Sequence, residues 1–592
     1  MLLAALGAAD GDTARPPAVA YRIEARVDET THVLVGRARL RYTHRAARPL
    51  DRLIFHQYLN AFRPHSLWAR RELAFGLSRF QDLGPDDHAF ERLRAVRVDG
   101  QPATVRYPYA PDSTVVEVRL PRPLRTGETA VVDLDWEARL ATVPRRQGRA
   151  GRHYDWAHWY PRIAVFDGCA WQARPHLPQG EFNGEFAGYD VTLEVAADQV
   201  LAATGVPVEG DPGWGIDDPA LLARGAYPPT PAEPLGLLGP APAPGAKRVR
   251  WRAERVHHFA WSMRPDFVHE GALLRSPARP PVALHVLYQR GDTAWPHQAL
   301  ERAQRALAWL EAKLGPYGWP QLTVVHRLES GGTEFPMLVM NGSASEGLIV
   351  HELTHQWFHG MLANNEWREG WLDEGLTTFV TNWYSEDHGA DPRAVWSRTL
   401  EALRQRERQG QTEPVAWPGA RFRDYATYSA MTYGKAAAVL RMLRHLVGPE
   451  AFARALRLYA TRHRFAHVDE GDLRAAFAQA TGRRWDWFFD AWLHSTAQLR
   501  LRVVEATTER RPDGRWRTRV VIERQGIAMP VDVAVGPTRV RADEPGEHLV
   551  IEALTPTPPE RVVLDPDEVL LTPERDGFEA RVRRQEEAAP RP

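Results

Sequence analysis

This sequence has a single cysteine, no net charge and no long apolar run. Cys169 is the only cysteine among 592 residues, which excludes an internal disulfide framework. Lysine plus arginine total 75, as do aspartate plus glutamate, so the chain has neither a basic field for nucleic acid nor an acidic excess. No stretch approaches the roughly eighteen apolar residues of a membrane-spanning helix. What remains is an ordinary globular composition, with 44% hydrophobic and 25% charged residues.

The first residues, MLLAALGAADGDTARPP, combine a short apolar run with small residues. This pattern is typical of the end of a signal peptide, although no positively charged segment precedes it. Residues 1–17 are therefore expected to be either a signal remnant or a disordered tail. A remnant favours a periplasmic or secreted location over a cytoplasmic one, and the scarcity of cysteine does not decide between them.

A chain of 592 residues exceeds what one core can organise, so several domains are expected. Over residues 18–272 apolar and polar residues alternate, as in YRIEARVDETTHVLVGRARLRYTH, which predicts an N-terminal antiparallel β domain. The alternation returns over residues 498–572 and predicts a small C-terminal β-sandwich. The polar end of the chain, residues 573–592, is expected to be a disordered tail.

The segment between these β regions, residues 273–497, contains the sequence H-E-L-T-H at positions 351–355. On a helix, residues i and i+4 share one face, so His351 and His355 can bind one metal ion with Glu352 beside it. A hydrolytic zinc site has three protein ligands and an open position for water. Glu374, which follows His355 after eighteen intervening residues, is the candidate third ligand. His359 continues the series but is rotated by about 80° from His351 and is interpreted as a non-ligand.

The spacing H-E-x-x-H, eighteen residues, then a glutamate within W-L-x-E-G resembles the M1 family of zinc aminopeptidases, a branch of the gluzincins. The segment WYPRIAVFD at 159–167 resembles one that is common in the amino-terminal domain of bacterial M1 enzymes. The resemblance implies a multidomain α+β fold with a thermolysin-like α/β catalytic domain over residues 273–497. It also implies one Zn²⁺ per chain. We further expect the type that lacks the large C-terminal helical domain of many M1 enzymes, and therefore a more open cleft.

The same resemblance assigns residues that would hold the substrate. G-G-T-E-F at 331–335 resembles the family's exopeptidase motif G-x-M-E-N. It implies that Glu334 pairs with the substrate ammonium, while Gly331 and Gly332 let the substrate backbone approach the strand. Threonine in place of methionine and phenylalanine in place of asparagine are departures that affect the side-chain pocket. Asp155 is a candidate second contact to the amine.

The chemistry also needs a base and a group that stabilises the oxyanion. Glu352, next to a ligand, can take the proton of the attacking water and pass it to the leaving amine. The segment M-T-Y-G-K-A at 431–436 resembles the family's Y-x-K-G segment and implies that Tyr433 donates to the developing oxyanion. Ala436 stands where the family has glycine. Tyr428 is a rival for the same role.

The sequence thus predicts a zinc-dependent aminopeptidase that hydrolyses N-terminal residues from peptides with a free amino terminus. One alternative is a zinc endopeptidase or dipeptide-releasing peptidase that uses the same site. Another is a non-catalytic scaffold with the M1 fold, although such relatives lose the metal ligands that this chain retains. Nucleic acid is not an expected partner. The preferred N-terminal residue and the oligomeric state stay open.

Overall fold

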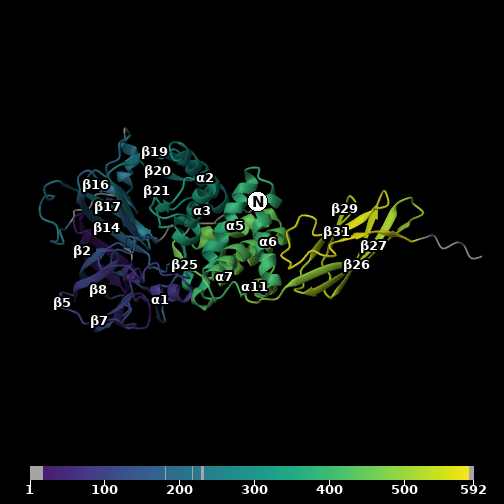
Figure 1. Cartoon of the computed structure of the whole chain (residues 1–592), viewed down its shortest axis with the longest axis horizontal. Coiled ribbons are helices and arrows are strands. Elements are labelled where there is room, and N and C mark those ends of the chain that lie inside the picture. Colours follow the sequence, from purple (N-terminus) through teal and green to yellow (C-terminus); the bar gives the residue numbers. More distant parts are fainter. Residues whose placement is uncertain (1–17, 181, 217, 228–232, 586–592) are drawn as a thin grey trace, which may run out of the picture.

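The computed structural model describes residues 18–585 except 181, 217 and 228–232, so the predicted signal remnant at 1–17 lies outside the described residues. The molecule is elongated, with a β-rich part at one end, helices in the middle and a small sandwich at the other end (Figure 1). Buried apolar side chains form one large connected cluster from Val19 to Phe578, so the core continues through all three parts. The predicted mixed α and β fold is confirmed. Within the described ranges, no helix combines the length and apolar character needed to cross a membrane.

The N-terminal part is built around an eight-stranded sheet in the order β16-β17-β14-β1-β2-β8-β4-β5. Strand β2 buries every second residue, which is the alternation that predicted a half-buried strand. Strands β1 and β14 pair in parallel, whereas the other neighbours are antiparallel. The strands are β1 (Val19–Asp28), β2 (Val33–Thr43), β4 (Phe90–Val98), β5 (Gln101–Pro102), β8 (Thr129–Arg139), β14 (Ala187–Ala196), β16 (Val206–Glu209) and β17 (Ala246–Val256).

Smaller elements complete this part. One four-stranded sheet contains β15 (Val200–Ala203), β18 (Trp261–Arg264), β10 (His153–Trp156) and β9 (Gly148–Ala150). A second contains β11 (Arg162–Ile163), β3 (Leu50–His56), β7 (Val115–Leu124) and β6 (Val105–Arg106), and β12 (Val165–Phe166) pairs with β13 (Trp171–Gln172). The short helices are η1 (Tyr58–Ala61), α1 (Leu67–Ala74), η2 (Pro219–Leu222) and η3 (Arg224–Ala226).

A five-stranded sheet in the order β19-β20-β21-β23-β22 opens the central part. Its strands are β19 (Phe267–Ser276), β20 (Arg279–Gln289), β21 (Gln321–His326), β22 (Gly332–Thr333) and β23 (Leu338–Asn341), and helix α2 (Gln298–Leu314) connects β20 to β21. The expected boundary after residue 272 falls inside β19, which pairs with β20 from Phe267 onward. It was misplaced because an alternating pattern shows that a strand forms and not which sheet it joins.

The helices that follow carry the predicted metal-binding residues. They are α3 (Glu346–His355), η4 (Gln356–Met361), α4 (Glu366–Glu369), α5 (Trp371–Asp387), α6 (Pro392–Arg408), η5 (Gly419–Arg421), α7 (Tyr425–Ser429), η6 (Ala430–Lys435), α8 (Ala436–Val447), α9 (Pro449–Arg462), α10 (Glu470–Thr481) and α11 (Asp486–Leu493). Strand β24 (Leu362–Asn364) pairs in parallel with β25 (Ala466–Val468). Gly482 ends α10 with a φ of 71°, a left-handed conformation that glycine adopts without strain.

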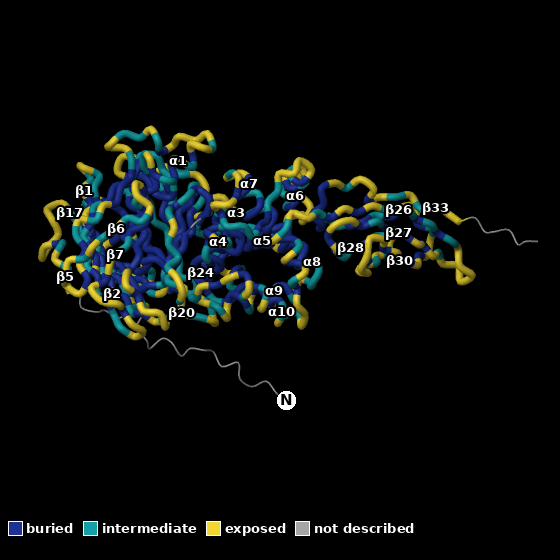
Figure 2. The backbone as a smooth tube through the Cα atoms, turned by 90° about the horizontal axis from the view of Figure 1, so that it is seen from below, coloured by how far each residue is buried: buried dark blue, intermediate teal, exposed yellow. Residues whose placement is uncertain are grey.

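The C-terminal sandwich consists of two four-stranded sheets, β30-β27-β26-β33 and β29-β28-β31-β32. Exposed residues are frequent on the sandwich, whereas buried residues are concentrated in the other two parts (Figure 2). Its strands are β26 (Leu499–Arg510), β27 (Trp516–Gly526), β28 (Val531–Val535), β29 (Thr538–Ala542), β30 (His548–Thr555), β31 (Arg561–Leu564), β32 (Glu579–Arg581) and β33 (Arg583–Arg584).

The expectation of a disordered tail from residue 573 is wrong for its described portion. Strand β32 pairs with β31 and β33 pairs with β26, so the sandwich extends to residue 584. Phe578 is buried just before these strands and joins the core. The polar sequence concealed this ordering because edge strands are held mainly by backbone hydrogen bonds.

Candidate metal centre

Helices α3 and α5 bring the three predicted metal ligands together. His351 and His355 project from α3, one turn apart, and their Nε2 atoms lie 3.2 Å from each other. Glu374, in the first turn of α5, places Oε2 at 3.3 Å from Nε2 of His351 and 3.4 Å from Nε2 of His355. The side chain of His351 is 21% exposed, whereas those of His355 and Glu374 are nearly inaccessible. The cluster is therefore reached from the side of His351.

This triangle has the dimensions of a zinc site. Zinc–nitrogen and zinc–oxygen bonds of about 2.0–2.1 Å in a tetrahedron place neighbouring ligand atoms about 3.3 Å apart. The three observed separations, 3.2, 3.3 and 3.4 Å, agree with that edge length. Two imidazoles and one carboxylate, with a fourth position left for water, are the donor set of many catalytic zinc sites. The residues present fit a zinc ion.

Asp373 orients His355 within this triangle. The Nδ1–H group of His355 donates to Oδ1 of Asp373 at 2.5 Å, and Oγ1 of Thr377 lies 3.2 Å from the same nitrogen. Because Nδ1 carries the proton, the lone pair of Nε2 points toward the other two ligands. Burial alone would lower the pKa of His355, but the charges of Asp373 and Glu374 raise it well above its usual value. Asp373 was missed from the sequence, although its place beside Glu374 was a usable signal.

The carboxylate of Glu374 stays ionised beside the two histidines. Burial alone would raise the pKa of Glu374, but His355 and His351 hold it well below its usual value. The hydroxyl of Tyr433 donates to the other oxygen of Glu374, Oε1. Burial and then the charge of Glu374 raise the pKa of Tyr433 well above its usual value, so this phenol keeps its proton. Tyr433 therefore presents a hydrogen-bond donor at the edge of the ligand triangle.

Tyr433 lies in a π-helical turn, η6, which joins α7 to α8. Such turns interrupt a helix locally and often position functional side chains. The rival residue, Tyr428, is buried with its hydroxyl 3.0 Å from the position a side chain on Gly370 would occupy. The ring of Tyr428 packs against Phe422. The structure thus brings Tyr433, rather than its rival, into hydrogen-bond contact with a metal ligand.

The side chain of Glu352 projects from α3 onto the edge strand β22. A Cβ atom placed on Gly332 would come within 1.9 Å of Oε1 of Glu352, so the carboxylate rests directly on the glycine. Carboxylate oxygens of Glu352 and Glu334 and a ring nitrogen of His355 all lie within 4.8 Å of one another. Burial raises the pKa of Glu352 to about 7, and Glu334 adds to this, although His351 and His355 act in the opposite direction.

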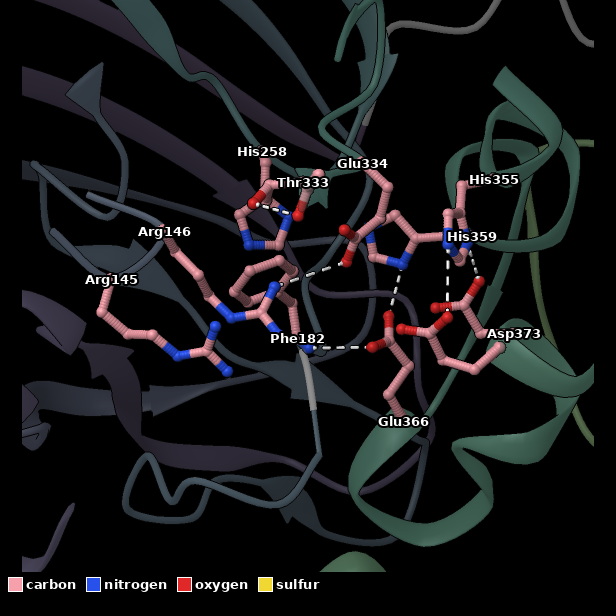
Figure 3. A network of polar contacts seen from close by, with 12 residues as sticks. Arg145, Arg146, Phe182, His258, Thr333, Glu334, His355, His359, Glu366 and Asp373 are labelled. Carbon is pink, nitrogen blue, oxygen red and sulfur yellow. Dashed lines mark hydrogen bonds and ion pairs between the residues drawn. The ribbon is translucent and has the colours of Figure 1, made fainter. Parts of the chain in front are cut away.

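Glu334 is a buried carboxylate beside the metal centre. Its Oε1 atom lies 3.9 Å from Nη1 of Arg146, whose guanidinium stacks on the ring of Phe182 (Figure 3). The backbone N–H of Arg146 donates to Glu329 at 2.8 Å, which holds the arginine loop against the segment that precedes Glu334. Sequence analysis missed Arg146 because it lies far from the motif in the chain and in a loop without a recognisable pattern.

The glycine segment before Glu334 is held at both of its ends. Gly331 has a φ of 72°, and its carbonyl accepts from the backbone N–H of Gly342 at 2.8 Å. Arg327 donates to the carbonyl of Ser330 at 2.5 Å and also to Oγ1 of Thr333. Gly332 lies between these contacts at the edge of the five-stranded sheet. Because it has no side chain, the carboxylate of Glu352 can pack directly against it.

Gln356 links this strand to the ligand helix. Its Oε1 atom accepts from the backbone N–H of Met337 at 2.8 Å, and its Nε2 atom donates to the carbonyl of Phe335 at 3.1 Å. Gln356 follows His355 directly, so the two contacts fix the distance between the H-E-x-x-H helix and the segment that carries Glu334. Sequence analysis missed this residue.

Asp155 is used elsewhere in the structure. Its carboxylate accepts from Oγ of Ser262 at 2.8 Å and from the backbone N–H of Leu328 at 2.9 Å, and it lies 3.1 Å from Nε2 of His153. These contacts place it under the start of the loop that leads to Gly331. Asp155 therefore supports that loop from the N-terminal part.

Residues 338–492 match the family model described as the Peptidase family M1 domain. This segment contains both ligand helices and Tyr433. This segment of the chain therefore matches peptidase family M1.

Two curated relatives illustrate the extent of the sequence similarity. Aminopeptidase N of Streptomyces lividans is 28% identical over 199 residues, which cover 32% of this chain and 22% of that protein. Alanine/arginine aminopeptidase of Saccharomyces cerevisiae is 31% identical over 142 residues, which cover 23% of this chain and 16% of that protein. The chain thus spans less than a quarter of the length of either relative.

Solved structures share the fold at low sequence identity. The M1 zinc metallopeptidase from Deinococcus radiodurans has a TM-score of 0.56 at 20% identity, covering 80% of this chain and 94% of that chain. Aminopeptidase A of Legionella pneumophila, solved with aspartic acid, has a TM-score of 0.64 at 14% identity, covering 97% of this chain and 60% of that chain. These likenesses support the mixed α and β architecture.

Proposed function

We propose that this chain is a zinc-dependent aminopeptidase that removes N-terminal residues from peptides. The observation that carries the proposal is the position of Glu334, a buried carboxylate within 4.8 Å of both a carboxylate oxygen of Glu352 and a ring nitrogen of His355. A negative charge beside the hydrolytic centre selects substrates whose positive amino terminus lies next to the scissile bond. Relatives named aminopeptidases, and a Deinococcus radiodurans M1 zinc metallopeptidase structure bound to a Tyr-Ser-Ala substrate, agree with this activity.

His351, His355 and Glu374 would hold the zinc ion, since their donor atoms form a triangle of the required size. When bound, zinc lowers the pKa of a coordinated water and polarises the substrate carbonyl. Asp373 keeps His355 in the tautomer that presents Nε2 to the site. The side chain of His351 is 21% exposed, so water can reach the proposed zinc site from this side.

Glu352 would act as general base and then as general acid. Its carboxylate takes the proton of the attacking water and transfers it to the nitrogen of the leaving amine. The contact between Glu352 and Gly332 holds the carboxylate at the strand along which the substrate would lie. Burial keeps the pKa of Glu352 near 7, close to the pH at which the group would exchange protons.

Tyr433 would stabilise the oxyanion that forms when water attacks the carbonyl. Its single phenolic proton, which is donated to Glu374 in this structure, would turn toward the oxyanion. A donor placed where negative charge develops stabilises the transition state more than the ground state. Tyr433 therefore adds a second electrophilic group to the site.

Glu334 would bind the substrate ammonium, and Gly331 and Gly332 would let the extended substrate backbone lie along β22. The backbone of β22 forms an edge of its sheet, so a peptide can add to it as a further strand. Since the ammonium is fixed by Glu334, the scissile bond is the first peptide bond of the substrate. This arrangement distinguishes an exopeptidase from an endopeptidase.

The test is hydrolysis of a panel of amino-acid 4-nitroanilides by the purified chain, before and after a chelator and after zinc is restored. We expect cleavage of free-amine substrates that the chelator abolishes and zinc recovers. Cleavage of internal bonds in N-acetylated peptides at a similar rate would favour the endopeptidase alternative. A zinc-loaded protein that cleaves neither kind of substrate would favour the scaffold alternative.

A further inference from the structure

A second group of histidines lies at the junction of the N-terminal part and the helices. His257 and His258 follow β17, whereas His359 belongs to η4, immediately after the metal-binding helix. All three are at most 3% exposed, and one ring nitrogen from each lies within 4.8 Å of the others. None of the three belongs to the ligand triangle of the proposed catalytic zinc.

The hydrogen bonds determine which nitrogen of His257 carries a proton. Nε2 of His257 lies 3.0 Å from the carbonyl oxygen of His359, which can only accept, so Nε2 carries the proton. Nδ1 of His257 therefore accepts a hydrogen bond from Nδ1 of His258 at 2.8 Å, which leaves the lone pair of His258 on its Nε2 atom, and a bound ion would replace this hydrogen bond. Burial lowers the pKa of both rings well below its usual value, so both are neutral at pH 7. Neutral imidazole is the form that binds metals.

His359 is oriented by a carboxylate in the same way as His355. Nδ1 of His359 pairs with Oε1 of Glu366, whose other oxygen accepts from the backbone N–H of Phe182 at 3.2 Å (Figure 3). Nδ1 therefore faces Glu366, and Nε2 is the ring nitrogen of His359 that lies away from this carboxyl group. A carboxylate that fixes the outer nitrogen of a histidine is typical of metal sites.

Within the part of the chain that the structure describes, three ring nitrogens of this cluster make no hydrogen bond, and one of them, Nδ1 of His359, faces Glu366. Nε2 of His258 and Nε2 of His359 are fully buried and make no hydrogen bond there. A buried polar atom without a partner costs free energy, because it has lost its hydrogen bonds to water. An occupant that accepts electron pairs from nitrogen would remove this cost.

We propose that His257, His258 and His359 bind a second divalent metal ion, of the imidazole-preferring class represented by Zn²⁺. Each histidine supplies one ring nitrogen. Glu366 contacts the other nitrogen of His359, and the carbonyl of His359 contacts the other nitrogen of His257. Imidazole ligands suit zinc, copper and nickel better than magnesium or calcium. Because two ligands come from the N-terminal part and the third from η4, the ion links the N-terminal part to the helices of the catalytic centre.

The metal content of the chelator-stripped full chain, dialysed against micromolar free Zn²⁺, tests this site. We expect two zinc ions per chain for the wild type, one for His351→Ala, one for His258→Gln and none for the double variant. His285→Gln, which changes another fully buried histidine outside the cluster, should keep two. One ion in the wild type, or two in His258→Gln, would overturn the proposal.

An anomalous-scattering map at the zinc edge, from wild-type crystals soaked in Zn²⁺, decides the matter if a variant does not fold. A peak surrounded by His257, His258 and His359 is expected, and its absence at saturating zinc would contradict the site. Neither measurement depends on hydrolysis. A chain with two ions but no peptidase activity would therefore refute the proposed function and leave the second site standing.

Discussion

Gly332 and Glu352 are in such close contact that a single methyl group on the glycine would overlap the carboxylate. The nearest carboxylate oxygen lies 1.9 Å from the position of that methyl group, and the carboxyl carbon lies 2.1 Å from it. Separations this short force one group to move. This contact thus fixes the position of Glu352, the proposed base, relative to β22, the strand along which the substrate would lie.

Gly332→Ala should therefore lower kcat/KM by about 10²-fold, since displacing a catalytic group by about 1 Å costs that much. Zinc content should not change, because the contact is with Glu352 and not with the ligands. The control is Gly347→Ala at the start of α3, where an added methyl group meets nothing within 4 Å. Steady-state kinetics and a metal assay check both variants. An alanine variant with wild-type kinetics would show that Glu352 is not the base.

Tyr433→Phe removes the donor beside Glu374 and keeps the ring. We expect kcat to fall by about 10²–10³-fold, with KM and zinc content nearly unchanged, because an oxyanion donor acts mainly in the transition state. Tyr428→Phe is the matched control, since that hydroxyl is buried and no described residue hydrogen-bonds to it. If the two variants lose activity equally, Tyr433 has no special role in stabilising the oxyanion.

Asp373→Asn keeps the shape of the side chain behind His355 and removes its charge. Zinc affinity should fall about 10–100-fold, as is usual for the partner of a metal-binding histidine. Competition with a chromophoric chelator measures this change. Asp387→Asn, near the other end of the same helix, changes only partly exposed contacts with Lys313 and Trp309 and should bind zinc as the wild type does. Equal affinities in the two variants would contradict the role of Asp373.

The metal triangle was predictable because it depends on local spacing. Two histidines four residues apart share a helix face whatever the rest of the fold does, and the spacing to Glu374 matched a known pattern. The alternating segments likewise predicted strands. The structure then brings His351, His355 and Glu374 together as expected.

Contacts between distant segments could not be predicted in the same way. Arg146, which itself has a left-handed φ of 58°, reaches Glu334 from a loop of the N-terminal part that is distant in the sequence. The pair at 257–258 is visible in the sequence, but its approach to His359 depends on how the N-terminal part packs on η4. Such packing has no signature in a single sequence. The same holds for the membership of β19 in the central sheet.

The effect of Glu334→Ala on amine selectivity tests the central claim most directly. The measured quantity is kcat/KM for a free-amine peptide relative to its N-acetylated form, with Glu346→Ala at the start of α3 as control. Loss of a buried ionic contact costs roughly 2–5 kcal/mol, so the preference for the free amine should fall about 30-fold or more. The control should keep the wild-type preference. An unchanged preference in Glu334→Ala would contradict the assignment of this chain as an aminopeptidase that reads the substrate ammonium through Glu334.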